Sequence, residues 1–352
     1  MTVFALGIEL DGEGSHPAAW RRAHHPPSDS LSGRTLTQKV RAAENAGFTL
    51  ATFDDSIVPP NAGIRGRVDA VNRASFVAAT TSTIGLVPVV ETTYAEPFHT
   101  SSQLATLDYS SRGRGGWIAA RVADPAAAGA WGRPVLAKQV DLDREQRDSI
   151  TVVRSLWDSW EDDAVIRDYA SGRFLDREKL HYVDFDGESF TVKGPAIVPR
   201  PPQGQLVAFG TESDREQVDV VLVADANHDA AVAAANDSAG LTFIELDVTL
   251  DTAQASAADR LAALNGHHPK PESSRLEYVG PATGFLDLLT ALAAHTDGVR
   301  LFPTVIDEDL PALARYVLPA LFKSGVAHRP VPGSSLRGNL GLPRPANRYA
   351  KV

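Results

Sequence analysis

The 352-residue chain contains no cysteine, and its single methionine is Met1. Without thiols there can be no disulfide framework, thiolate zinc site, iron–sulfur cluster or cysteine nucleophile. Aromatic residues are also scarce, at 7% of the chain. What remains is a chain of 43% hydrophobic residues, which is enough for a large core and argues against general disorder.

Positive charge is in deficit. Lys and Arg total 34 against 44 Asp and Glu, a formal net charge of −10, and the chain has no basic block. This balance argues against a nucleic-acid partner. No apolar run approaches the roughly 18 residues that span a bilayer, and the N-terminal segment MTVFALGIELDGEG lacks the basic region of a signal peptide. We therefore expect a soluble cytoplasmic protein without membrane contact.

Short apolar runs alternate with amphipathic segments along the chain. The helical segments are expected at 35–46, 67–81, 98–110, 141–160, 228–237, 253–264, 283–294 and 309–323. The strand candidates are Val3–Leu10, Leu50–Phe53, Ile84–Val90, Trp117–Val122, Leu206–Phe209, Val218–Val223, Leu241–Val248 and Val299–Phe302. Eight strands alternating with helices predict a (β/α)8 TIM barrel, with a doubly wound open sheet as the alternative.

The pattern also predicts how this barrel departs from a regular one. We expect a single barrel domain over 1–330, which includes an irregular insertion at about 164–205, followed by an extended tail at 331–352. The second half is shortened, because only Gly210–Gln217 separates the fifth and sixth strands. A parallel crossover that contains a helix needs roughly 10–12 residues. Either a helix is missing there or one of the two strands is wrongly assigned.

Motifs that identify a site by themselves are absent from the sequence. The ten histidines show no HExxH or comparable spacing, so His24-His25 and His267-His268 are interpreted as surface loops, with metal binding as the weaker alternative. We predict no metal site. There is no GxSxG elbow and no Walker loop. The glycines of SRGRGGW (111–117) precede a strand instead of following one, which excludes a dinucleotide fingerprint.

Barrel geometry gives better candidates, because functional groups gather where the strands end. Asp54, Asp55 and Ser56 end the second strand. The paired carboxylates are candidates for acid–base groups, with helix capping or a solvated turn as the alternative. The other candidates are Glu91–Tyr94 after the third strand, Arg121 after the fourth, Gly210–Ser213 after the fifth and Arg300 within the eighth.

Trp157 and Trp160 lie at helical spacing, next to an acidic run that includes Asp162 and Asp163. Tryptophans at this spacing are typical of a core or of an interface anchor. We interpret the pair chiefly as core residues.

Several segments together indicate a family. They are TTYAEPFH (92–99), QLATLDYSSRGRGGW (103–117), RSLWDSWEDDA (154–164), HYVDFDGESFTVKGP (181–195), VPRPPQGQ (198–205), DGVRLFPTV (297–305) and LRGNLGLPRPANRY (336–349). In this order they resemble the bacterial luciferase-like flavin-dependent monooxygenases, and most closely the group that acts on nitrilotriacetate, EDTA, dibenzothiophene sulfone and long-chain alkanes. The resemblance extends over nearly the whole chain.

This resemblance implies a TIM barrel that uses reduced FMN and O2 to oxygenate a small organic substrate. It also implies a separate flavin reductase and a homodimer, in which the Trp157/Trp160 helix helps to form the interface. The implied flavin-site residues are Asp55, which matches the family's Asp after the second strand, together with Glu91, Gly210 and Ser213. Arg121 is a candidate cation for a phosphate or a substrate.

The chain departs from the family pattern at the flavin site. After Trp117 the family's Asn and Thr-Ser residues are replaced, and the stretch 123–147 has lost a His and an Arg-Tyr pair, so the catalytic residue is unknown. The phosphate loop is reduced to 209–213, and Glu212, Asp214 and Glu216 crowd it, although FMN phosphate carries a charge of about −2. FMN binding in the usual pose is therefore expected to be weak or absent unless Arg121 or Arg215 compensates.

Two alternatives follow from these departures. The first is a non-catalytic paralogue or partner subunit that has lost flavin binding. The second is an oxidoreductase that uses a deazaflavin cofactor, as related barrels do.

Overall fold

A computed structural model describes residues 4–58 and 66–350. Val3, the first residue of the expected first strand, and residues 351–352 of the expected tail lie outside these ranges. The core of the fold is a closed parallel barrel of eight strands. They are β1 (Ala5–Glu9), β2 (Leu50–Phe53), β3 (Gly85–Glu91), β4 (Gly116–Ala120), β9 (Val207–Gly210), β10 (Val220–Val223), β11 (Leu241–Leu250) and β13 (Gly298–Pro303).

The pairing of the strands closes the barrel. β1 pairs in parallel with both β2 and β13, and β10 pairs with both β9 and β11, so the eight strands form a ring. All eight predicted strands are present and the (β/α)8 barrel is confirmed; the open-sheet alternative is wrong. The strands are buried on both faces, which is why they appear in the sequence as continuous apolar runs such as LVPVV in β3.

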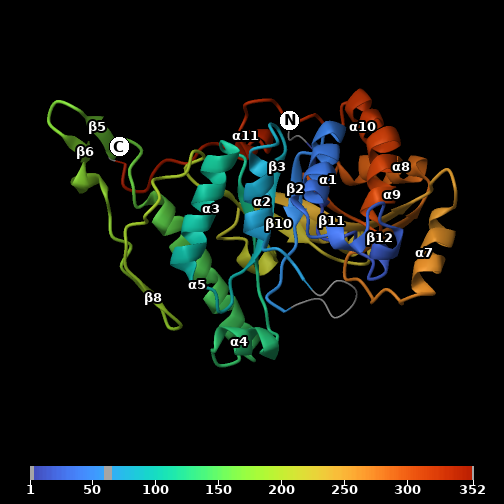
Figure 1. Cartoon of the computed structure of the whole chain (residues 1–352), viewed down its shortest axis with the longest axis horizontal. Helices are drawn as coiled ribbons and strands as arrows, with labels where there is room; N and C mark the ends of the chain where they lie inside the picture. The colour runs from blue at the N-terminus through green and yellow to red at the C-terminus, as the bar shows by residue number, and fades with distance from the viewer. Residues whose placement is uncertain (1–3, 59–65, 351–352) are drawn as a thin grey trace.

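Helices cover the outer face of the barrel (Figure 1). They are α1 (Gly33–Ala46), α2 (Ala70–Ala78), α3 (Pro97–Ser111), α5 (Gln139–Asp158), α6 (His228–Asp237), α7 (Ala257–Asn265), α8 (Ala282–Leu292), α9 (Ile306–Ala312) and α10 (Leu318–Ser324). α1 illustrates why a helix begins and ends where it does. The Ser32 side chain accepts a hydrogen bond from Thr35 N at its start, and Gly47 ends it with a φ of 101°. Among the residues described, no helix is long and apolar enough to cross a membrane.

The elements that were not predicted include one helix and one strand next to the barrel. α4 (Pro125–Trp131) lies in the shortened stretch after β4, and β12 (Leu276–Gly280) pairs with the end of β11 outside the closed ring. The short crossover between β9 and β10 contains a single 3-10 turn, Glu212–Asp214. Both strands are therefore correctly assigned, and the helix between them is missing.

Between α5 and β9 lie two small antiparallel pairs. They are β5 (Val165–Asp168) with β6 (Arg173–Leu175), and β7 (Phe185–Asp186) with β8 (Thr191–Val192). The β5–β6 pair projects from the barrel next to the C-terminus (Figure 1). Trp157 and Trp160 are buried, and their indole N–H groups donate to Ser101 O and Ala196 O. They are core residues, as the spacing indicated, and attach this region to the barrel.

The last part of the chain contains a short helix, α11 (Leu336–Asn339), and otherwise has no regular structure up to residue 350. Leu336 enters the barrel at the first residues of β3 and β4, where a Cβ on Gly85 or Gly116 would lie 2.6 or 2.9 Å from it. The buried Arg337 forms an ion pair with Asp219 at 2.9 Å. The tail thus closes the N-terminal end of the barrel, and α4 lies at the opposite end (Figure 1).

Candidate functional site

The open end of the barrel is where the parallel strands finish, and it collects the candidate residues. β1, β2, β3, β4 and β9 bring Glu9, Asp54, Glu91, Arg121 and Gly210 to this mouth. The mouth has two sides, defined here by their strands. The acid side comprises the ends of β1, β2, β3 and β13, and the cradle side comprises the ends of β4 and β9 with the loop 211–214.

A buried arginine organises the interior below the acid side. The Arg300 guanidinium contacts Glu9 at 2.6 Å, Glu245 at 2.7 Å and the Thr52 hydroxyl at 3.0 Å. Burial alone would raise the pKa of Glu9, but Arg300 and the hydrogen bond from Thr52 hold that pKa below its usual value. A buried cation between two carboxylates fixes both of them, so Glu9 is a permanent negative charge beneath the mouth.

Asp54 stands above this pair and behaves differently. Its side chain is exposed to solvent at the mouth, and no described residue donates a hydrogen bond to its carboxylate. Its immediate surroundings are nevertheless crowded with protein: partial desolvation and the negative charge of Glu9 raise the pKa of Asp54 to about 6. A carboxyl group with this pKa and a free side chain can take up or release a proton near neutral pH.

Asp55 and Glu91 support the backbone beside Asp54. Asp55 accepts from Ala70 N at 2.6 Å and from Ser56 N at 2.9 Å, so it holds the start of α2. Glu91 accepts from Ile57 N at 3.2 Å. Burial raises the pKa of both carboxyl groups. The capping alternative thus accounts for the contacts of Asp55, and a contact of Asp55 or Glu91 with flavin stays a prediction.

On the cradle side, Arg121 is paired with carboxylates of the same chain. Its guanidinium donates to both carboxylate oxygens of Asp214, at 2.5 and 3.0 Å, and to Ser213 Oγ at 2.9 Å. Its Nε forms an ion pair with Asp143 at 2.7 Å. Arg121 and Ser213 therefore lie together, as expected for residues of one site. The anion that Arg121 binds, however, is the Asp214 carboxylate of the same chain and not a ligand phosphate.

The Asp214 carboxylate is completely buried in what we call the cradle: Arg121, Gln146 and Thr211. Gln146 Nε2 donates to it at 2.8 Å, Thr211 N at 3.1 Å and the Thr211 hydroxyl at 3.0 Å. Gly210 leaves the room for it, because a Cβ there would lie 3.0 Å from Asp214 Oδ2. Gly210 thus leaves room both for the carboxylate and for Val218, whose Cγ1 would also lie 3.0 Å from the added Cβ.

This arrangement decides whether the loop fits the phosphate of FMN. A phosphate needs cations, hydroxyls and backbone N–H groups, and these donors already bind Asp214. Arg215, the other candidate cation, forms an ion pair with Glu212 at 3.0 Å. A second anion would meet the buried charge of Asp214 at close range. The residues present do not fit the phosphate.

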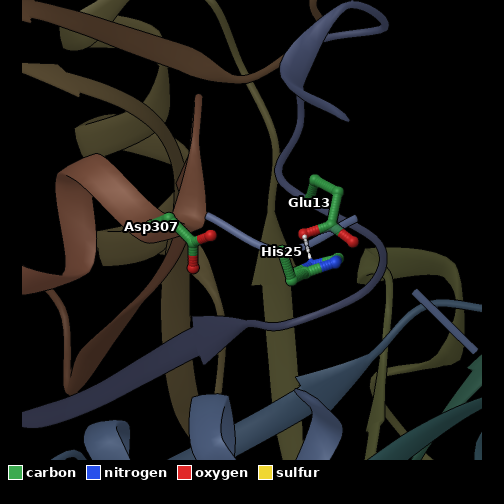
Figure 2. A group of neighbouring side chains, drawn as sticks. All are labelled: Glu13, His25 and Asp307. Carbon is green, nitrogen blue, oxygen red and sulfur yellow. Dashed lines mark hydrogen bonds and ion pairs between the residues drawn. The ribbon is translucent and has the colours of Figure 1, made fainter. Parts of the chain in front are cut away.

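A third cluster lies between the β1–α1 loop and α9, and it has the residue types of a metal site. Glu13, His25 and Asp307 can bring one ligand atom each within 4.8 Å of one another, and Figure 2 shows Glu13 bonded to His25 with Asp307 standing apart. The contacts of Glu13 and His25 indicate that this cluster binds a proton on His25 and not a metal ion. Lys39 Nζ lies 2.5 Å from the same Glu13 oxygen, and both His25 ring nitrogens contact acceptors, Glu13 Oε2 and Pro26 O.

A cavity of about 480 Å³ lies beside the acid side, between the β1–α1 loop and the start of α2. Trp20, Leu31 and Phe76 supply apolar walls. Asp11 lines it as well and pairs with Arg67 at 2.9 Å and with Arg73 at 2.5 Å. A cavity of this size with a few polar groups suits a small organic ligand.

Sequence reasoning missed three contributors to these sites. Glu9 lies in the otherwise apolar run FALGIEL, and a charge inside a buried strand was a usable signal that it pairs with Arg300. Asp214 was interpreted only as a charge that repels phosphate. Arg121 and Asp214 follow strands that are neighbours in the barrel, and this placement also predicts an ion pair between them. Gln146 gave no signal, because its helix position shows only that it is buried.

Comparison with known proteins agrees with this architecture. The Luciferase-like monooxygenase family model matches residues 15–272. The chain is 27% identical to N-acetyl-S-(2-succino)cysteine monooxygenase of Bacillus subtilis over an alignment of 434 residues that spans 98% of each chain. It is 31% identical to one of the subunits of pristinamycin IIA synthase of Streptomyces pristinaespiralis, over 90% of this chain and 91% of the relative.

The fold is also that of solved relatives. The crystal structure of a long-chain alkane monooxygenase superposes with a TM-score of 0.84, at 17% identity, over 97% of this chain and 96% of that one. A closed eight-stranded barrel, a family match over most of the chain and relatives aligned nearly end to end agree with one another. The chain belongs to the luciferase-like monooxygenase family, whose members are flavin-dependent.

Proposed function

We propose that this protein is a flavin-dependent monooxygenase that oxygenates a small organic substrate with reduced flavin and O2. A separate flavin reductase would supply the reduced flavin, and the protein would form a homodimer. Family membership supports the reaction class. The observation that carries the proposal is the mouth itself. There the Asp54 carboxylate has no hydrogen-bond donor among the described residues, and Arg73, which lines the cavity, donates to Asp54 O.

Asp54 would exchange a proton with the reacting molecules at the mouth. Its carboxylate is unpartnered among the described residues, and its pKa of about 6 leaves it able to hold or release a proton near neutrality. Burial and the charge of Glu9 keep this pKa raised, and Arg300 keeps the pKa of Glu9 below its usual value. Glu9 and Arg300 would therefore be positioning residues, and Asp54 the group that acts.

The cavity suggests the class of substrate. Trp20, Leu31 and Phe76 suit an apolar body, while Arg67 at the wall would pair with an acidic or strongly polar group. Arg67 is already paired with Asp11, so a substrate anion would share or displace that contact. We infer a small organic substrate with an apolar part and one polar end.

Because the loop 210–214 does not fit a phosphate, no step is assigned to FMN. Bound flavin supplies the activation of O2 in this family, and here it would have to be held without the usual anchor for its phosphate. The buried pairing of Arg121 with Asp214 favours a second candidate, a partner subunit that has lost flavin binding. Similarity to a protein that is named as one subunit of a synthase supports this candidate as well.

Flavin titration and oxygen consumption test the proposal. The purified chain would be titrated anaerobically with reduced FMN, reduced riboflavin and a reduced deazaflavin, and then assayed for substrate-dependent oxygen uptake with a flavin reductase. Binding of a reduced flavin, with turnover that Asp54→Asn abolishes, would support the monooxygenase. A stable fold without binding of any flavin would overturn it and favour the partner subunit. Binding of the deazaflavin alone would select the deazaflavin oxidoreductase.

A further inference from the structure

The cradle around Asp214 has the composition of an anion-binding site. It offers an arginine fork, a backbone N–H, a hydroxyl and a side-chain amide, all directed at one point. These are the donors that proteins use to bind phosphate and sulfate. In this chain the anion at that point is part of the protein.

We infer that Asp214 is an internal counter-anion that makes this site reject phosphate, so that the flavin accepted at the mouth is one whose phosphate does not contribute to binding. The inference rests on the proposed function in so far as it names the flavin class. The cradle itself rests only on contacts within the chain. Asp214 would then be a specificity-determining residue of the mouth.

Burial is the first argument. The Asp214 side chain is fully buried and the Arg121 side chain is 13% exposed, so solvent screens the attraction between the two charges only weakly. A buried carboxylate that accepts from an arginine and from several other donors is stable, and a second anion cannot enter without displacing it. The donors of the cradle are therefore unavailable to a ligand phosphate while Asp214 remains in place.

Backbone geometry is the second argument. The β9–β10 connection is too short for a helix and forms a single 3-10 turn, in which Asp214 and Thr211 cap each other. Gly210 has no Cβ at the point where one would meet Asp214. The turn and the glycine together place the carboxylate at the end of β9, so the short crossover and the internal anion belong to one structural feature.

Charge balance is the third argument. Arg121 also pairs with Asp143, so the arginine is flanked by two carboxylates even before a ligand arrives. Removing Asp214 leaves one carboxylate and restores a site for an external anion. Removing Asp143 leaves the cradle filled. These two substitutions form a matched pair with opposite expectations.

The experiment uses the full chain and inorganic phosphate as the probe. Phosphate binding would be measured by calorimetry and by the shift in melting temperature, at constant ionic strength, for the parent, Asp214→Ser, Asp143→Asn and Asp214→Ser/Arg121→Gln. Asp214→Ser should bind phosphate at least about tenfold more tightly than the parent, because several charge-assisted hydrogen bonds are freed. Asp143→Asn and the double variant should bind like the parent.

If Asp214→Ser does not fold, Asp214→Ala is read by the same criterion, because it also empties the cradle, and the comparison of FMN with riboflavin in the parent needs no substitution at all. A folded Asp214 variant with no gain in phosphate binding would overturn the inference. So would a parent protein that already binds phosphate in a manner lost in Arg121→Gln.

The flavin arm separates this inference from the proposed function. The parent should bind reduced FMN and reduced riboflavin equally, and Asp214→Ser should bind FMN about tenfold more tightly than riboflavin. A gain for phosphate without binding of any flavin would support the cradle and refute the monooxygenase. A parent that strongly prefers FMN over riboflavin would support flavin binding and refute the cradle.

Discussion

The two sides of the barrel mouth use the same residue types to opposite effect. On the cradle side, the arginine and the carboxylate satisfy each other, and Asp214 is fully buried. On the acid side, Arg300 satisfies Glu9 and Glu245 below the surface and leaves Asp54 without a partner above them among the described residues. The donors of the cradle side are occupied by Asp214, whereas the acid side has a carboxyl group, Asp54, whose pKa is raised to about 6 by burial and by the charge of Glu9.

The two sides therefore differ in which of their charges are satisfied within the chain. The cradle side depends on a short crossover, whose 3-10 turn places Asp214 at the end of β9. The acid side depends on residues inside strands, where Glu9 and Arg300 are fixed by the barrel itself. The cradle side is thus built from a loop, and the acid side from strands.

The largest expected effect comes from removing the charge that organises the acid side. Arg300→Met leaves Glu9 and Glu245 buried without their cation, which should cost about 3–5 kcal/mol in the free energy of unfolding. Urea denaturation measures it. The control is Arg344→Gln, which removes a half-exposed arginine from Asp162 and should cost no more than about 1 kcal/mol. Equal effects of the two substitutions would contradict the organising role of Arg300.

The next effect on stability tests whether the Asp214 side chain is what excludes a Cβ at position 210. Gly210→Ala places a Cβ 3.0 Å from both Asp214 and Val218. It should lower the free energy of unfolding by about 1–3 kcal/mol. The penalty should fall in an Asp214→Ser background. Gly129→Ala is the control: it lies in α4 with no atom within 4 Å of the added Cβ and should stabilise by about 0.5–1 kcal/mol. An unchanged penalty in the double variant would show that Gly210 and Asp214 are independent.

Asp54 gives a smaller effect that depends on pH. Because its folded pKa is raised to about 6, the unfolded chain ionises first, and this residue lowers stability as pH rises from about 4 to 7. Asp54→Asn should therefore be more stable than the parent at pH 8, with the difference shrinking toward pH 5. Urea midpoints at the two pH values measure this, and the exposed Asp287→Asn on α8 serves as control. A difference that grows toward low pH would have the wrong sign.

The smallest effect concerns the cluster in Figure 2. Burial lowers the pKa of His25, but hydrogen bonds to Pro26 O and Glu13 outweigh it, and the net pKa is raised. The stabilisation is then present at low pH and lost as pH rises through the folded pKa. The parent should exceed His25→Gln in stability more at pH 5.5 than at pH 8.5, whereas the exposed His328→Gln should show little change. Stabilisation by added zinc would instead favour a metal site.

The sequence predicted the barrel well because buried parallel strands leave a strong local signal. Runs such as VVLV at 220–223 are apolar on both faces, which only a covered strand requires. The candidate residues were placed at the correct end of the barrel for the same reason. α4 was missed because a short helix of small residues, PAAAGAW, has no amphipathic pattern.

The content of the site was less predictable, because it depends on contacts between distant residues. Arg121, Gln146 and Asp214 meet only after β4, α5 and the 211–214 turn come together. Acidity near a phosphate loop therefore predicted repulsion, whereas the structure shows a satisfied pair. A local pattern gives the charge of a loop, and only the fold determines which charge it binds.

The measurement that tests the central claim most directly is the ratio of dissociation constants for reduced riboflavin and reduced FMN with the unsubstituted protein. If the Asp214 carboxylate already fills the cradle, the phosphate adds nothing to binding and the ratio should be close to one. If FMN binds about a hundredfold more tightly, a difference of about 2.7 kcal/mol, the phosphate is anchored and the account is contradicted.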